Sequence, residues 1–140
     1  MLNLKIGNRE FQVKFGYEAT LKSRLISRMA KMNASAQGAE SNFEKVEDML
    51  LFIPDALLVG LQKFHSDEFG YNYSTGEDYE KQKEKVFALV AEHIDDDGVD
   101  CVDFFNQLQD EMLQNGFLSK MFQNEVEKEM KEQHAEKKES

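Results

Sequence analysis

Apolar and polar residues largely alternate at the start of the chain, on either side of Gly7 and Asn8. A period of two is typical of β-strands, and a Gly-Asn pair between two alternating runs predicts a two-residue turn. Cross-strand partners then have numbers that sum to 15, so Leu4 lies opposite Phe11 and the apolar side chains share one face. We therefore predict a β-hairpin over residues 2–15 whose apolar face packs on the rest of the protein.

The rest of the chain follows the helical period, in which apolar residues recur every three or four positions. A first helix is predicted from Tyr17 through Met32, then a polar loop over 33–42, then a second helix from Phe43. Pro54 removes a backbone donor within the second helix. We therefore expect a break or kink there and a new helical start at the proline.

The second half alternates between helices and connecting segments. Residues 66–77 form a loop too aromatic for a solvated linker, so it either packs back on the body or meets a partner. Helices are predicted over 78–95, over about 102–113 and from 117 to 126. The charged residues of 127–140 predict a frayed or disordered tail.

These elements predict a mainly α fold, a small helical bundle preceded by an N-terminal β-hairpin, as a single domain over residues 1–126. A chain of 140 residues with 41% apolar residues can bury a core of its own. It has no apolar run near eighteen residues and no leader sequence, so we expect a cytoplasmic protein that binds no membrane. Its net charge of -10 argues against a general nucleic-acid binder.

The charge is distributed unevenly along the chain. Residues 1–35 carry a net charge of +5 and the other 105 residues carry -15. Arg24, Arg28 and Lys31 form a basic stripe beside the apolar face of the first helix. Such a polar molecule is expected to self-associate head to tail through this stripe, or to dock a basic partner at its acidic end. The alternative is a set of solvated helix faces.

An aspartate-rich segment of thirteen residues starts at His93 and contains five aspartates and one glycine. A calcium-binding loop needs oxygen ligands at positions 1, 3, 5 and 12 and a glycine at position 6. With Gly98 at position 6, His93 takes position 1 and Phe104 position 12, so the first and last ligands are missing. We therefore expect Gly98 to end one helix in the left-handed conformation and Asp97 or Asp100 to cap the next.

Candidate catalytic groups are few and scattered. His65, His93 and His134 lie far apart, without a cysteine at metal-ligand spacing. Cys101 lies among aspartates and is expected to be a core or boundary residue rather than a nucleophile. No glycine-rich phosphate loop opens a helix. We expect no catalytic residues, no metal, no cofactor and no enzymatic activity.

Soft and flat apolar side chains are numerous, with eleven phenylalanines and seven methionines. Methionine adapts to irregular partners and aromatic residues are enriched at interfaces, although both also fill cores. The residues predicted to bind a partner are Phe52, Leu57, Leu58, Leu61, Phe69, Tyr71 and Tyr73.

Four stretches carry a family resemblance: LNLKIGNREF at 2–11, FGYEA at 15–19, FIPDALL at 52–58 and the aspartate-rich turn before Phe104. Together they resemble the tail assembly chaperones of long-tailed phages and prophages of Gram-positive bacteria. The resemblance covers roughly residues 1–130 and lies in the order of elements and in short stretches of sequence, without a catalytic signature.

The resemblance implies a helical, non-enzymatic protein made in the cytoplasm of the infected host and absent from the mature virion. It would bind the tape measure protein, keep it soluble, help to recruit tail tube protein and form homo-oligomers along its client. A longer product that contacts tube protein commonly arises in this family by a programmed frameshift, and the codons for Lys137-Lys138 could supply the slippery site. The alternatives are an acidic helical adaptor or regulator unrelated to phage and, less favoured, a calcium sensor.

Overall fold

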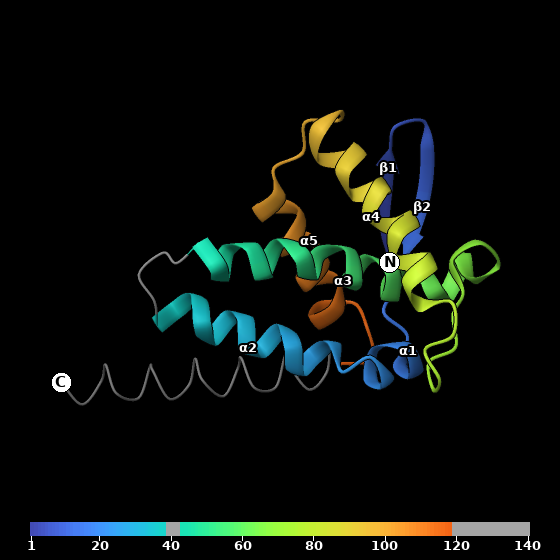
Figure 1. Ribbon diagram of the computed structural model, residues 1–140, viewed down its shortest axis with the longest axis horizontal. Coiled ribbons are helices and arrows are strands. Elements are labelled where there is room, and N and C mark those ends of the chain that lie inside the picture. The colour runs from blue at the N-terminus through green and yellow to red at the C-terminus, as the bar shows by residue number, and fades with distance from the viewer. Residues whose placement is uncertain (39–42, 119–140) are drawn as a thin grey trace.

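The protein is mainly helical with an N-terminal two-stranded hairpin, as predicted (Figure 1). The structure, a computed structural model, describes residues 1–38 and 43–118. The elements in chain order are β1 (Leu2–Ile6), β2 (Arg9–Val13), α1 (Tyr17–Lys22), α2 (Leu25–Gly38), α3 (Phe43–Phe69), α4 (Tyr79–Asp95) and α5 (Cys101–Gln114). The hairpin, α4 and α5 surround the middle of α3, while α2 runs alongside its first half (Figure 1).

The hairpin has the predicted register, with Leu2 opposite Val13 and Leu4 opposite Phe11. Gly7 adopts the positive φ of 60° that the two-residue turn requires. The buried face of the hairpin consists of Leu4, Ile6, Phe11 and Val13. A hairpin of this size is marginal alone, so its stability comes from packing this face against the helices.

The free edge of β2 is tied to α3 by backbone donors. The N–H of Lys14 donates to the carbonyl of Gly60 at 2.9 Å, and the N–H of Gln12 donates to Nε2 of His65 at 3.0 Å. Gly60 permits this close approach, because a Cβ at that position would lie 2.5 Å from Cγ1 of Val13. The strand edge is therefore covered by a helix rather than left open.

The central helix α3 is buried at every position from 52 to 62. The break or kink predicted at Pro54 is wrong, because the helix continues through the proline and its backbone leaves helical geometry at His65 instead. A proline inside a helix costs about 3 kcal/mol. Packing of α3 on most sides offsets that cost, since both the proline and its neighbours lie in the core.

The first predicted helix is divided into α1 and α2. Arg24 adopts a left-handed φ of 55° between them, so the single helix expected from Tyr17 to Met32 is wrong. The break lets α1 bury Ala19 while α2 buries Leu25. The loop predicted over 33–42 is also wrong in part, because α2 extends to Gly38. Residues 39–42 lie outside the described residues.

The aspartate-rich segment connects α4 to α5 as predicted, with Gly98 at a left-handed φ of 73°. Asp100 is the N-cap of α5, and its carboxylate accepts the N–H groups of Val102 and Asp103 at 2.9 and 3.1 Å. Asp97 has another role, since its Oδ2 accepts the N–H of Gly7 at 3.0 Å. This contact ties the end of α4 to the tip of the hairpin.

Helix α5 ends at Gln114, close to the end predicted near residue 113, and Asn115 is its C-cap. The predicted helix over 117–126 lies beyond the described residues except for Phe117 and Leu118. The predicted tail over 127–140 lies wholly outside them.

Candidate functional site

Most of the residues predicted to bind a partner are in the core. Phe52, Leu57, Leu58, Leu61 and Phe69 expose 2% or less of their surface, so their prediction as an interaction surface is wrong. The physical reason is the position of α3, which the hairpin, α2, α4 and α5 all contact. A helix that is apolar on all sides is a buried helix.

Tyr71 and Tyr73 lie in the loop between α3 and α4, which packs back on the body. The Tyr71 ring contacts those of Tyr73 and Tyr79 edge-on, with centroid distances of 5.1 and 5.2 Å. This arrangement is the one that aromatic rings prefer, because the positive edge of one ring meets the negative face of another. Phe69, predicted as part of this loop, instead ends α3.

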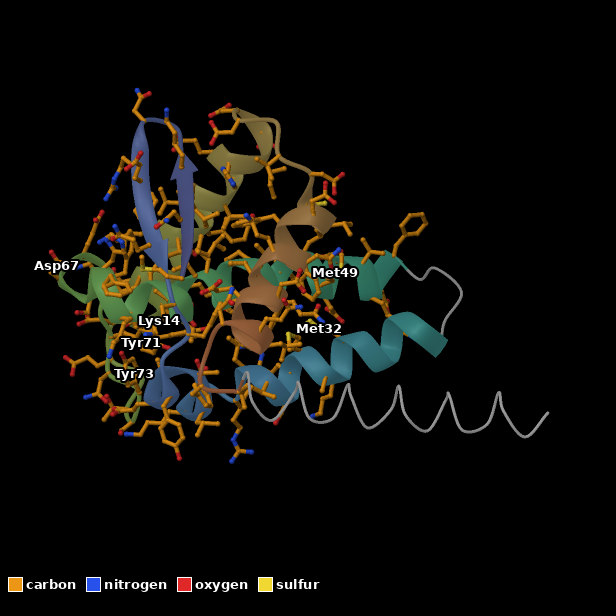
Figure 2. All side chains as sticks on the ribbon, turned by 180° about the vertical axis from the view of Figure 1, so that it is seen from behind. Lys14, Met32, Met49, Asp67, Tyr71 and Tyr73 are labelled. Carbon is orange, nitrogen blue, oxygen red and sulfur yellow. The ribbon has the colours of Figure 1, made fainter. Side chains whose placement is uncertain are left out.

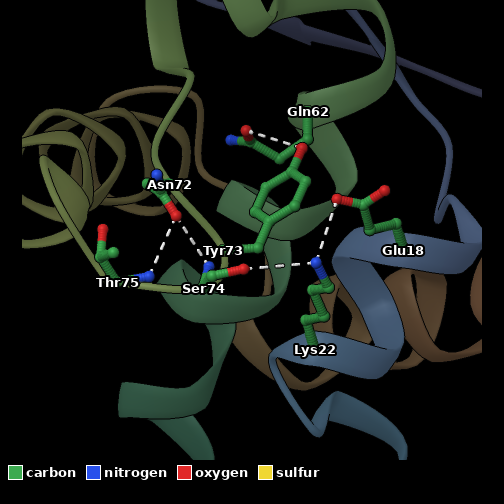
Figure 3. Close-up of polar contacts among 7 residues, drawn as sticks. All are labelled: Glu18, Lys22, Gln62, Asn72, Tyr73, Ser74 and Thr75. Atoms are coloured by element: carbon green, nitrogen blue, oxygen red, sulfur yellow. Dashed lines mark hydrogen bonds and ion pairs between the residues drawn. The ribbon is translucent and has the colours of Figure 1, made fainter.

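Hydrogen bonds fix the loop in shape and position (Figure 3). The side-chain oxygen of Asn72 accepts the N–H groups of Ser74 and Thr75 at 2.9 and 3.0 Å, which closes a tight turn. The hydroxyl of Tyr73 donates to Oε1 of Gln62 at 3.3 Å. Gln62 is buried in α3, so the loop is anchored to the central helix.

Asp55 lies 5% exposed on α3 and collects three donors from two other helices. Arg28 of α2 approaches to 2.6 Å, the Tyr79 hydroxyl of α4 donates at 2.7 Å, and Lys83 of α4 lies at 3.3 Å. Burial alone would raise the pKa of Asp55, but the hydrogen bonds from Arg28 and Tyr79 and the charges of Arg28 and Lys83 outweigh it and hold the pKa below its usual value. The carboxylate is therefore charged at neutral pH and joins α2, α3 and α4.

The predicted basic stripe is divided by this network. Arg28 is engaged inside the molecule, in its ion pair with Asp55 and over the ring of Phe52 at 5.2 Å. Arg24 and Lys31 are exposed. Of the three residues predicted for self-association, these two are exposed, while Arg28 is partly exposed and paired with Asp55.

A recess of about 170 Å³ lies where α1, α2, α4 and the loop between α3 and α4 meet. We call it the tyrosine recess; its lining residues are Lys22, Ser23, Arg28, Tyr71, Asn72, Tyr73, Gly76 and Tyr79. In Figure 2, Tyr71 and Tyr73 lie at the α1 side of the molecule, away from Met32 and Met49. The ammonium group of Lys22 lies 3.5 Å from a carboxylate oxygen of Glu18 and 3.4 Å from the Ser74 hydroxyl (Figure 3).

The phenol of Tyr71 remains a hydrogen-bond donor over the whole physiological pH range. Burial, together with the nearby Tyr73 and the charge of Asp55, raises the pKa of Tyr71 to about 12. The same causes act on Tyr79, whose pKa is raised by burial and by its hydrogen bond to Asp55. The recess therefore presents protonated phenols beside two cations.

A second surface feature lies at the start of α3, far from the tyrosine recess. We call it the distal apolar end; it consists of Phe43, Val46 and Leu51, which expose 90%, 43% and 47% of their surface. Met49 and Leu50 are half-buried beside it and pack against the core. Helical periodicity identifies an apolar stripe that includes Phe43 and Val46, but it does not show whether other elements cover that stripe.

The histidines and the cysteine lie apart. His65 accepts a hydrogen bond from β2, and His93 is buried with its Nδ1 3.0 Å from Asp97. Cys101 is half-buried, and His134 lies outside the described residues. Over residues 1–38 and 43–118, no three His, Cys, Asp or Glu side chains form a group that could hold a metal ion. Within the same part of the chain, no helix has the length and apolar character needed to cross a membrane.

Comparison of the chain with protein-family models, with curated proteins and with solved structures finds no match. The tyrosine recess and the distal apolar end are therefore the physical starting points for inferring its function.

Proposed function

We propose that this protein is a non-enzymatic tail assembly chaperone of a long-tailed phage or prophage. It binds the tape measure protein in the cytoplasm of the infected bacterium, keeps it soluble and helps to recruit tail tube protein. The sequence resemblance suggests this role, and the observation that carries it in the structure is the distal apolar end. A binding protein for a helical client needs apolar side chains that are free to meet one.

The distal apolar end has the chemistry that such a client requires. Phe43 exposes 90% of its surface, more than any other large apolar side chain in the described part of the chain. Exposed aromatic residues are costly in water and are typical centres of protein interfaces. Met49 lies next to this surface, and methionine adapts its shape to irregular apolar partners.

The charge of the chain supports the same role. A complex between apolar surfaces stays in solution only if the assembly carries enough net charge, and this chain supplies -10. Arg24, just before α2, and Lys31 on α2 are exposed, so electrostatic attraction between copies remains available for homo-oligomers. Higher salt weakens such attraction, whereas oligomers held by apolar contacts tolerate it.

Co-expression tests the proposal. The chain is produced together with the longest helical protein encoded downstream of its gene, and the pair is recovered by pull-down and sized by light scattering. We expect a large soluble complex, and an insoluble partner when that protein is produced alone. A partner that is soluble alone and does not bind contradicts the proposal, and an adaptor unrelated to phage then takes its place.

Two matched variants locate the contact. Phe43→Ser removes the most exposed ring among the described residues, and we expect the fold to be retained because 90% of the surface of Phe43 is exposed. Truncation of a central aromatic residue at an interface costs about 2 kcal/mol or more, which is roughly thirtyfold in affinity. Phe87→Ser on α4, 46% exposed, is the control and leaves binding unchanged. Equal losses in both variants would place the client elsewhere.

A further inference from the structure

Free hydrogen-bond donors converge on the tyrosine recess. The hydroxyls of Tyr73 and Tyr79 are occupied by Gln62 and Asp55, but that of Tyr71 bonds to no described residue. With the described residues, Lys22 makes only long contacts of 3.4 and 3.5 Å, and Arg28 uses one terminal nitrogen for Asp55. Lysine has three donors and arginine five, so both retain unused N–H groups. These donors fit a ligand that supplies acceptor oxygens.

The acidic side chains near the recess do not occupy its unused hydrogen-bond donors. Among residues 1–38 and 43–118, no acidic side chain lines the recess. Glu18 and Asp55 hold Lys22 and Arg28 from outside it. Glu77 and Asp78 follow Gly76 along the loop and are exposed, but neither belongs to the lining.

The backbone around the recess is strained. Arg24 and Asp78, with φ of 55° and 68°, are the only non-glycine residues with positive φ in the described part of the chain. Each is the immediate neighbour of a lining residue, Ser23 and Tyr79 respectively. A left-handed non-glycine residue costs roughly 1–2 kcal/mol, and such residues cluster at functional sites. Both strained positions thus shape one recess.

We propose that the tyrosine recess binds the side-chain carboxylate of a glutamate presented by a partner polypeptide. Lys22, Arg28 and the Tyr71 hydroxyl donate to its two oxygens, and the tyrosine rings pack against its methylene groups. A recess of about 170 Å³ is larger than a single water needs and admits one such side chain. This inference goes beyond the proposed function, because it holds for any polypeptide that presents the glutamate.

Capped peptides test the site directly on the full chain. The probes are acetyl-Ala-Glu-Ala-amide, the same peptide with glutamine, and acetyl-Ala-Ala-Ala with a free terminal carboxylate. Binding is followed by the amide chemical shifts of the isotope-labelled protein. We expect the glutamate peptide to shift Lys22, Tyr71 and Gly76 in a saturable manner. The glutamine peptide should bind at least tenfold more weakly, because charge-assisted hydrogen bonds are lost.

Variants distinguish the recess from general attraction of an acid to a basic surface. Lys22→Gln should weaken the glutamate peptide at least tenfold, whereas Lys31→Gln, an exposed cation of α2 outside the recess, should leave it unchanged. Equal binding of the glutamate and glutamine peptides, or shifts spread over other elements, would overturn the proposal. Binding of the free-carboxylate peptide alone would overturn the assignment to a side chain. None of these results depends on the tape measure protein, so failure here is separate from failure of the chaperone role.

Discussion

Replacement of Asp55 by asparagine removes the charge at the junction of α2, α3 and α4 and keeps the shape of the side chain. Hydrogen bonds to a charged group contribute about 1.5–3 kcal/mol each. Arg28 and Lys83 are 37% and 34% exposed, so water replaces part of what they lose. Asparagine also retains one acceptor oxygen. We therefore expect the free energy of unfolding to fall by about 2 kcal/mol, and the melting temperature by roughly 7 °C.

The pH dependence of this effect has a definite sign. The pKa of Asp55 lies below its usual value in the folded protein, against about 3.9 in the unfolded chain. Its stabilising contribution is therefore present above about pH 4 and is lost as the pH falls from there through the folded pKa. The difference in free energy of unfolding between the natural protein and the Asp55→Asn variant should therefore become smaller below about pH 4.

Urea unfolding followed by circular dichroism, at about pH 7 and again at about pH 3, measures both effects. Asp67→Asn is the matched control, because Asp67 is an exposed aspartate of the same helix (Figure 2). It should change stability by less than about 0.5 kcal/mol. Two results would contradict a stabilising charge at Asp55. One is an Asp55→Asn variant as stable as this control at pH 7. The other is a loss of unfolding free energy that is the same at both pH values.

Three further substitutions are measured by the same denaturation assay. Gly60→Ala places a Cβ 2.5 Å from Cγ1 of Val13 and should cost about 1–3 kcal/mol; no loss would mean that α3 and β2 separate without penalty. Asp100→Ala removes the N-cap of α5 and should cost about 1 kcal/mol, and a neutral effect would show that the cap is not formed. Arg24→Gly relieves a left-handed backbone and should raise stability by about 0.5 kcal/mol; a loss would show that the arginine side chain stabilises the fold.

Local patterns along the chain were sufficient for several elements. Alternation with a Gly-Asn turn predicted the hairpin to the exact pairing of Leu4 with Phe11. Helical periodicity predicted α4, and Asp100 was one of two predicted caps for α5. In each case the turn, register or cap depends on residues that are close together in sequence, so the local sequence is enough to predict it.

The errors arise where distant segments decide the outcome. Helix α3 continues through Pro54 because packing from elements far along the chain offsets the local cost. From sequence alone, Leu57 and Leu58 fit a client-binding surface as well as a core. They are buried because other elements of the fold pack around them. The tyrosine recess could not be predicted either, since its lining residues come from α1, α2, α4 and the loop before α4, which come together only in the folded protein.

The single helix α3 joins the most buried and one of the most exposed parts of the described chain. Amide hydrogens over 52–62 can exchange with solvent only when the surrounding elements separate, which is unfolding of the whole domain. Those over 43–48 can exchange when the first turns of the helix open, because the side chains there are exposed. The start of α3, which carries the proposed client surface, can therefore open and re-form while the other half of the same helix keeps the domain intact. Adaptability and rigidity are thus separated along one helix rather than assigned to separate elements.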